Sequence, residues 1–177
     1  MNIAYTMAPG RGDTDLLLYQ LAQTMLKQGR RPCGTVQINT GRENEGPCDM
    51  DVKVLPEGPI IRISQQLGHA AKGCRLDPNA LETAVGLVEA SLLEGADCLI
   101  VNKFGKHEAE GRGFRSVIAE ALSCDIPVLV GLNQLNAEAF MNFVGGEAVV
   151  VPPEEAALKS WMEMACGPAV QMANLSG

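Results

Sequence analysis

The sequence lacks any apolar run long enough to cross a membrane. A transmembrane helix needs ~20 consecutive apolar residues, and no segment of the 177 residues approaches this length. The chain also opens on Met1 and a short mixed segment, without a charged leader followed by a long apolar region. We therefore expect a cytoplasmic protein.

The sequence also lacks an excess of basic residues. It contains 14 Lys and Arg against 21 Asp and Glu, which gives a formal net charge of -7. Nucleic acids and anionic membrane surfaces are bound by basic surfaces, so we expect neither as a partner. A small local site for an anion is compatible with this charge.

Cysteine spacing of the kind that marks disulfide frameworks is absent too. The chain has six cysteines and no C-x-x-C pair. In a chain of this size and type they are expected to be reduced thiols. Cys33, Cys98 and Cys124 lie in or beside apolar segments, which predicts that they are buried.

Polar loops before the second half of the chain contain a possible second site. Cys74 precedes Arg75, whose charge lowers the pKa of a thiol, and Asp77 follows. The alternative is a loop thiol packed under the next helix cap. We expect no metal site, because the separations of the metal-ligating residues in this region fit no compact zinc pattern; these residues are Cys48, His69, Cys74 and His107.

Strand and helix patterns alternate along most of the chain. Strands are predicted over 2–7, 32–38, 52–55, 60–63, 99–101, 126–132 and 147–151, and helices over 16–27, 78–94, 112–123, 136–143 and 154–164. This alternation predicts an α/β fold of three layers: a largely parallel sheet with helices on both faces, plus a small inserted hairpin at about 51–64. We expect one domain over 1–166 and a C-terminal tail over 167–177.

The first predicted strand leads into a glycine-containing loop and then a helix, which is the context of a phosphate-binding loop. The loop contains Gly10, Arg11, Gly12, Asp13 and Thr14. The P-loop pattern has lysine where Asp13 stands, and a carboxylate repels phosphate. Two interpretations stay open: a tight turn in which Thr14 or Asp13 caps the helix, and a modified anion cradle of backbone N–H groups with Arg11.

A cluster of charged and amide side chains follows the buried strand at 99–101. Open α/β sheets place ligand sites where strands end and lead through loops into helices. The cations of this cluster suit a phosphate or an oxyanion such as molybdate; the alternative is local pairing with neighbouring glutamates. The candidate anion-binding residues are Asn102, Lys103, Lys106, Glu108, Arg112 and Arg115.

Four strings together resemble the bacterial family of unknown function DUF2478. They are Cys48–Met50, Ile63–Gln65, Gly73–Asp77 and Asn102–Gly113. The similarity runs over most of residues 2–150, and the last string is the most specific. The family has no settled biochemical role, so the resemblance implies little about activity beyond an association with molybdenum-related genes.

The strand end is also similar, more distantly, to small thermophilic-type nucleoside triphosphatases of the P-loop class, which implies a P-loop NTPase-like fold. Those proteins carry Asp-Glu-Ile-Gly-Lys-Met-Glu where residues 102–108 read Asn-Lys-Phe-Gly-Lys-His-Glu. Asn102 replaces the Mg²⁺-associated aspartate, and Lys103 replaces the glutamate expected to orient the attacking water. Lost carboxylates weaken Mg²⁺ binding, and without the metal hydrolysis is slow.

At one position in each of two segments, the charge is opposite to that in the similar nucleoside triphosphatases. Asp13 is negative where the similar proteins are positive, and Lys103 is positive where they are negative. With the first strand and the strand at 99–101 as neighbours in a parallel sheet, these side chains meet. We therefore predict an Asp13–Lys103 ion pair.

These features together predict a binding protein that holds a nucleotide, a phosphate-bearing cofactor or an oxyanion without efficient hydrolysis. One alternative is a nucleotide-dependent hydrolase or phosphotransferase with altered catalytic residues. Another is an interaction subunit with a vestigial site. The sequence identifies neither catalytic residues nor the ligand, and it leaves open whether the chain forms a homo-oligomer.

Overall fold

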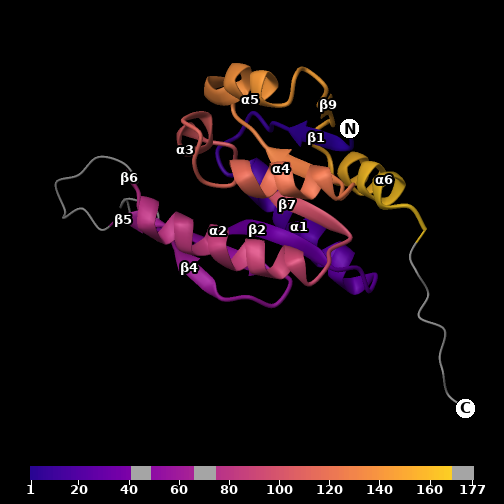
Figure 1. Cartoon of the computed structure of the whole chain (residues 1–177), viewed down its shortest axis with the longest axis horizontal. Helices are drawn as coiled ribbons and strands as arrows, with labels where there is room; N and C mark the ends of the chain where they lie inside the picture. The colour runs from indigo at the N-terminus through magenta and orange to yellow at the C-terminus, as the bar shows by residue number, and fades with distance from the viewer. Residues whose placement is uncertain (41–48, 66–74, 169–177) are drawn as a thin grey trace, which may run out of the picture.

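A seven-stranded, mostly parallel sheet forms the centre of the computed structural model, which describes residues 1–40, 49–65 and 75–168 (Figure 1). The strand order is β4-β3-β2-β7-β8-β1-β9. Strands β2, β7, β8, β1 and β9 are parallel, and β3 and β4 are antiparallel to their neighbours. The strand bounds are β1 (Ile3–Thr6), β2 (Pro32–Thr40), β3 (Asp49–Leu55), β4 (Ile60–Arg62), β7 (Cys98–Val101), β8 (Val128–Gly131) and β9 (Val149–Val150).

Helices cover both faces of this sheet, as Figure 1 shows for α2 and α4 on the near face. The helices are α1 (Asp13–Lys27), α2 (Pro78–Leu93), α3 (Lys106–Ala109), α4 (Arg115–Ser123), α5 (Ala137–Phe143) and α6 (Glu155–Cys166), with a 3₁₀ turn η1 (Gln134–Asn136) before α5. One apolar cluster contains side chains of α2, α4 and α5, and a second contains those of α1 and α6. The predicted three-layer α/β fold is confirmed.

The strand β7 shows why two layers of helices are needed. All four of its residues are buried. Leu99 and Val101 point into the α2–α4 cluster, whereas Cys98 and Ile100 point into the α1–α6 cluster. Because successive strand side chains point to opposite faces, a strand that is apolar at every position has to be covered on both sides.

The predicted hairpin is present, and it extends the main sheet. β3 pairs with β2, and β4 pairs with β3, both antiparallel. Next to it, β5 (Ser64–Gln65) and β6 (Arg75–Leu76) form a separate two-stranded antiparallel ladder. The predicted Asp77 cap of α2 is also confirmed, since its carboxylate accepts the N–H groups of Asn79 and Ala80.

One prediction about the start of the fold is wrong, and the side-chain cap, one of the two interpretations of the first loop, is not observed. β8 lies between β1 and β7, so the first strand and the strand at 99–101 are not neighbours. The helix α1 begins at Asp13 with Gly12 as its N-cap in a left-handed conformation, and no side chain caps it. Glycine adopts this conformation without a steric penalty, which accounts for glycine at this position.

Among the described residues, none of the helices is long and apolar enough to pass through a lipid bilayer. Most of the predicted C-terminal tail, residues 169–177, lies outside the described residues.

Candidate functional site

A cavity of about 640 Å³ opens at the carboxyl ends of β2 and β7. This is the edge of a parallel sheet where α/β proteins place their ligand sites. We call it the main cavity. Its lining residues are Arg11, Gly12, Asp15, Thr35, Gln37, Met50, Val52, Ile63, Leu76, Leu81, Asn102, Lys103, Gly105, Lys106, His107, Glu108 and Phe114.

The main cavity brings the two predicted anion-binding segments together in part. Arg11 and Gly12 come from the loop after β1, and the segment after β7 contributes four of its predicted residues. Those four are Asn102, Lys103, Lys106 and Glu108. The other predicted residues have different surroundings, which are described below.

The loop after β1 is closed by contacts among its own residues. The Thr14 hydroxyl accepts the Ala8 N–H at 2.9 Å, and the Asp13 N–H donates to the Gly10 carbonyl at 3.3 Å. The Asp13 carboxylate lies directly against Gly10, where a Cβ atom would collide with it. Gly10, Asp13 and Thr14 therefore shape the loop and do not line the main cavity.

Asn102 connects three elements at the floor of the main cavity. Its side chain is 5% exposed. The amide Nδ2 donates to Asp15 Oδ1 of α1 at 2.9 Å and to Gln37 Oε1 of β2 at 3.4 Å, and Oδ1 accepts the Gln37 N–H at 2.9 Å. Both polar atoms of this amide thus have partners within the protein.

Three cations lie around the mouth of the main cavity. Arg11, Lys103 and Lys106 are all exposed. Lys106 forms a salt bridge with Glu110, with 3.7 Å between Nζ and Oε1. Lys103 forms no salt bridge with any of the described residues, and the predicted Asp13–Lys103 ion pair is absent. The reason is the sheet order, which separates β1 from β7 by one strand.

Glu108 is a buried carboxylate that holds the connection between β7 and α4 in shape. It is 3% exposed. One oxygen accepts the Gly105 N–H at 2.9 Å and the other accepts the Phe114 N–H at 3.2 Å. Gly113 has a φ of +61° and packs so closely on this carboxylate that a Cβ atom would collide with it. Both carboxylate oxygens therefore accept hydrogen bonds from the backbone of this loop.

The two arginines of the predicted site lie outside the main cavity. Arg112 forms a salt bridge with Glu110 and lines a separate, smaller cavity of about 360 Å³ at the start of α2. The Arg115 guanidinium stacks over the Phe143 ring, 4.6 Å from its centroid, and donates to the Glu108 carbonyl. The Arg112 contact is the local pairing with a glutamate given above as the alternative, whereas Arg115 contacts an aromatic ring and a backbone carbonyl.

The possible second site lies partly outside the described residues. Cys48, His69 and Cys74 belong to segments that the structure does not describe, whereas Arg75 and Asp77 are described. The Asp77 carboxylate is engaged in capping α2. Within the described ranges no group of three or more His, Cys, Asp and Glu side chains is placed to hold a metal ion.

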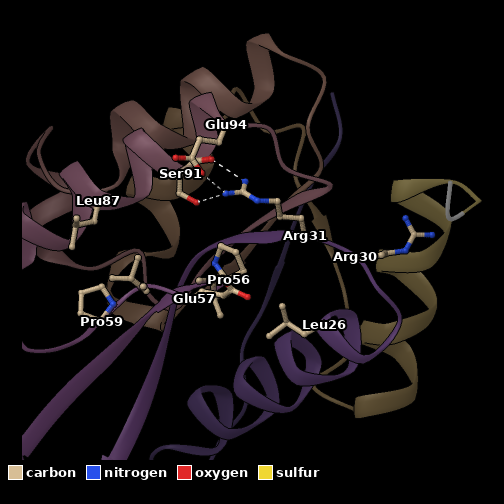
Figure 2. Close-up of a pocket in the computed structure, with 12 residues that line it drawn as sticks. Leu26, Arg30, Arg31, Pro56, Glu57, Pro59, Leu87, Ser91 and Glu94 are labelled. Atoms are coloured by element: carbon tan, nitrogen blue, oxygen red, sulfur yellow. Dashed lines mark hydrogen bonds and ion pairs between the residues drawn. The ribbon is translucent and has the colours of Figure 1, made fainter. Parts of the chain in front are cut away.

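Another cavity, of about 460 Å³, lies at the opposite edge of the sheet, near the amino end of β2 (Figure 2). Arg31 crosses it and donates to the Ser91 carbonyl and to Glu94, each at 3.0 Å. Arg30 points away from it and donates to the Gly167 carbonyl. The cations of this cavity therefore act as structural donors.

Sequence reasoning missed several residues of the main cavity. Asp15 and Gln37 are positioned by their bonds to Asn102, and apolar side chains from β3 and α2 line the far side. Asp15 directly follows Thr14, the last of the predicted loop residues. Gln37, a polar residue near the end of a buried strand, was the available indication of a site.

Comparisons with known sequences identify a family and a relative of this chain. A family model described as "Protein of unknown function (DUF2478)" matches residues 3–161. The "Molybdenum import ATP-binding protein ModC 2" of Bradyrhizobium diazoefficiens is 34% identical over 149 residues, which are 84% of this chain. Those residues are 17% of that protein, so the chain spans less than a fifth of the relative's length.

A solved structure supports the fold assignment. The solution structure of a human cancer-related nucleoside triphosphatase superposes with a TM-score of 0.58 over 85% of this chain and 87% of that one. The sequence identity is 17%, so the likeness concerns the fold. The expected P-loop NTPase-like architecture is confirmed.

Proposed function

Because the chain belongs to the DUF2478 family, whose description assigns no function, we propose a function from the geometry of the main cavity. The protein binds a phosphate-bearing ligand or another oxyanion in this cavity and does not hydrolyse it efficiently. The fold and the relatives connect the chain to nucleoside triphosphatases and ATP-binding proteins.

One observation carries the proposal: the position of Lys103. Lys103 lines the main cavity, and its side chain forms no salt bridge with any residue in the described part of the chain. Arg11 lines the same cavity from the loop after β1. In a protein with a net charge of -7, two cations at the carboxyl ends of parallel strands favour an anion there.

The hydrogen bonds at the floor of the cavity argue against efficient hydrolysis. A P-loop hydrolase holds Mg²⁺ through an acidic residue at the end of such a strand and a hydroxyl of its phosphate loop. Here Asn102 is bonded to Asp15 and Gln37, and the Thr14 hydroxyl accepts the Ala8 N–H. The neutral amide oxygen of Asn102 binds Mg²⁺ more weakly than a carboxylate at that position would.

One relative is named as a molybdenum import protein, which suggests molybdate as a second class of ligand. Molybdate is a tetrahedral dianion, so it has the shape and charge sign of phosphate. Two cations beside a glycine-containing loop suit either ion. We therefore include molybdate, together with orthophosphate and ATP, among the anions to be tested.

Thermal unfolding in the presence of each anion tests the proposal. A ligand that binds only the folded protein stabilises it by about 2.7 kcal/mol at a concentration of a hundred times Kd. We expect an increase in Tm with at least one of the three anions, and no release of phosphate from ATP above the protein-free rate. Phosphate release would support the hydrolase alternative.

Two lysine variants make this test specific. Lys103→Gln is expected to raise the Kd for the stabilising anion about tenfold, since a charge-assisted bond is worth about 1.5–3 kcal/mol. Lys159→Gln removes the same charge from α6, where the lysine lies beside Glu163, and should leave the Kd within about twofold. No increase in Tm with any anion would overturn the proposal.

A further inference from the structure

The main cavity has two chemically different sides, and we infer that its ligand has two different ends. The structure assigns to it an organic anion: an oxyanion such as a phosphomonoester, joined to an aromatic group. A bare inorganic oxyanion would fill one end alone. This inference rests on the function proposed above and narrows it to one class of ligand.

The cationic side comes from two loops. Arg11 belongs to the loop after β1, and Lys103 and Lys106 to the segment after β7. Asn102 and Gln37 adjoin them and bond to one another. Asp15 and Glu108 also line the cavity, and their carboxylates accept hydrogen bonds from the Asn102 amide and from backbone N–H groups. With these carboxylates engaged, this half of the cavity suits the oxyanion.

The opposite side is apolar and comes from other parts of the fold. It is formed by Met50, Val52, Ile63, Leu76, Leu81 and Phe114. These side chains lie on β3, in or beside the β5–β6 ladder, and on or next to α2 and α4. Figure 1 shows β6 and the start of α2 at the same end of the molecule as α3, which follows β7 in the chain. Residues of both sides line the same cavity.

The apolar side continues the hydrophobic core. Val52, Ile63, Leu81 and Phe114 belong to the apolar cluster beneath α2 and α4 and are each at most 7% exposed. Water in contact with such a wall finds few hydrogen-bond partners. An apolar ligand group that displaces this water gains binding free energy in proportion to the area buried.

One of the wall's side chains favours an aromatic group in particular. The thioether of Met50 makes favourable contacts with ring edges, whereas Phe114 is only 2% exposed and supports the wall from the core. Met50 is also partly exposed, so its side chain can adjust to a ligand. An aliphatic group of the same size would lack these ring contacts.

The size of the main cavity agrees with this class. Sites for small organic molecules enclose about 300–1,000 Å³, and this cavity holds about 640 Å³. A tetrahedral oxyanion by itself would leave most of that volume to water, including the part beside the apolar wall.

A series of phosphates with increasing apolar area tests the inference by calorimetric titration. The probes are orthophosphate, methyl phosphate, phenyl phosphate and 1-naphthyl phosphate, which present the same anionic group. We expect Kd to fall along the series, with 1-naphthyl phosphate binding at least about tenfold tighter than methyl phosphate, a difference of ~1.4 kcal/mol.

A pair of methionine variants locates the effect. Met50→Gln keeps the length of the side chain and makes the wall polar, so it should bring the Kd of 1-naphthyl phosphate to within about threefold of that of methyl phosphate. The same variant should leave the Kd of orthophosphate unchanged. Met164→Gln, an equal change at a 76% exposed position of α6, should preserve the full series.

The possible outcomes distinguish the apolar subsite inferred here from the anion binding proposed above. Equal Kd values for all four phosphates, weakened together by Lys103→Gln, would overturn the apolar subsite and leave anion binding standing. If the differences in Kd among the four phosphates are the same in Met50→Gln as in the unmodified protein, the apolar subsite would also be overturned. Failure of every phosphate to bind would overturn both proposals.

Discussion

Polar side chains with internal partners shape the surroundings of the main cavity at the scale of single residues. Asn102 bonds to Asp15 and Gln37, and Glu108 bonds to two backbone N–H groups. Buried polar groups are costly unless they are hydrogen-bonded, so these side chains have defined positions before any ligand arrives. Lys103 differs from them because its charge has no salt-bridge partner among the described residues.

The bond between Asn102 and Asp15 yields the first prediction. In Asn102→Asp, the donor at 2.9 Å from Asp15 Oδ1 becomes a second carboxylate, so a hydrogen bond is replaced by repulsion. We expect a loss of about 2 kcal/mol in the free energy of unfolding, measured with urea. Adding Asp15→Asn restores a donor opposite a carboxylate and should recover about half of the loss. Additive effects of the two substitutions would contradict this account.

Two neighbouring thiols yield the second prediction. A hydrogen bond from Cys98, together with the charge of Arg30, lowers the pKa of Cys166. The same bond and burial raise the pKa of Cys98. Since the thiolate is the nucleophile, alkylation of Cys166 by iodoacetamide should rise at a lower pH than for an ordinary thiol, and native Cys98 should resist it. Peptide mapping by mass spectrometry follows each site.

The variant Cys98→Ala provides the control for this pH profile. It removes the hydrogen bond to Cys166, so the midpoint of Cys166 alkylation should move to higher pH. An unchanged midpoint would show that the bond is not the cause. Cys124, predicted to be buried, is exposed, because it follows the last residue of α4; it will react in every sample.

At the scale of elements, the connection from β7 to α4 depends on one tight contact. Gly113 has a φ of +61° and lies against the anchored carboxylate of Glu108, whereas Gly145 has a φ of +64° and open space around it. Alanine at either position costs about 1 kcal/mol for the left-handed backbone. At Gly113 the collision adds to this, so we expect Gly113→Ala to lose about 3 kcal/mol and Gly145→Ala about 1 kcal/mol in urea unfolding. Equal losses would contradict the packing described here.

Elements were predictable from the sequence where local rules decide them. Apolar runs and helical spacing located β7 and α4, and the Asp77–Pro78 pair located the start of α2. The N-cap of α1 was not predictable in this way. A sequence of glycine followed by polar residues is compatible both with a left-handed glycine cap, as at Gly12, and with a cap by a polar side chain. The cluster of cations after β7 predicts Arg112 and Arg115 in the anion site, with pairing to nearby glutamates as the alternative; Glu110 is such a neighbour of Arg112, but Phe143, the partner of Arg115, is distant in sequence and follows only from the three-dimensional structure.

The order of strands belongs to the scale of the whole molecule. The sequence predicts that β1 and β7 are both in a parallel sheet, but it contains no local indication that β8 lies between them. That order follows from how α1, α2 and α4 cross and pack on the two faces. It removes the predicted Asp13–Lys103 pair and leaves Lys103 at the main cavity. The prediction of the Asp13–Lys103 pair was therefore wrong because the order of the strands was not predictable from the sequence.

The same strand order predicts a gradient of stability across the sheet. β7 and β8 are central, fully buried and paired on both sides, whereas β4 and β9 are at the edges and expose Ile60, Val149 and Val150 by 53–60%. Amides of central strands exchange with solvent only through global unfolding, and those at edges through local opening. Hydrogen exchange should therefore be slowest at Leu99–Val101 and Val128–Val130 and much faster in β4 and β9. Exchange in β4 as slow as in β7 would show that the antiparallel hairpin unfolds only together with the parallel core.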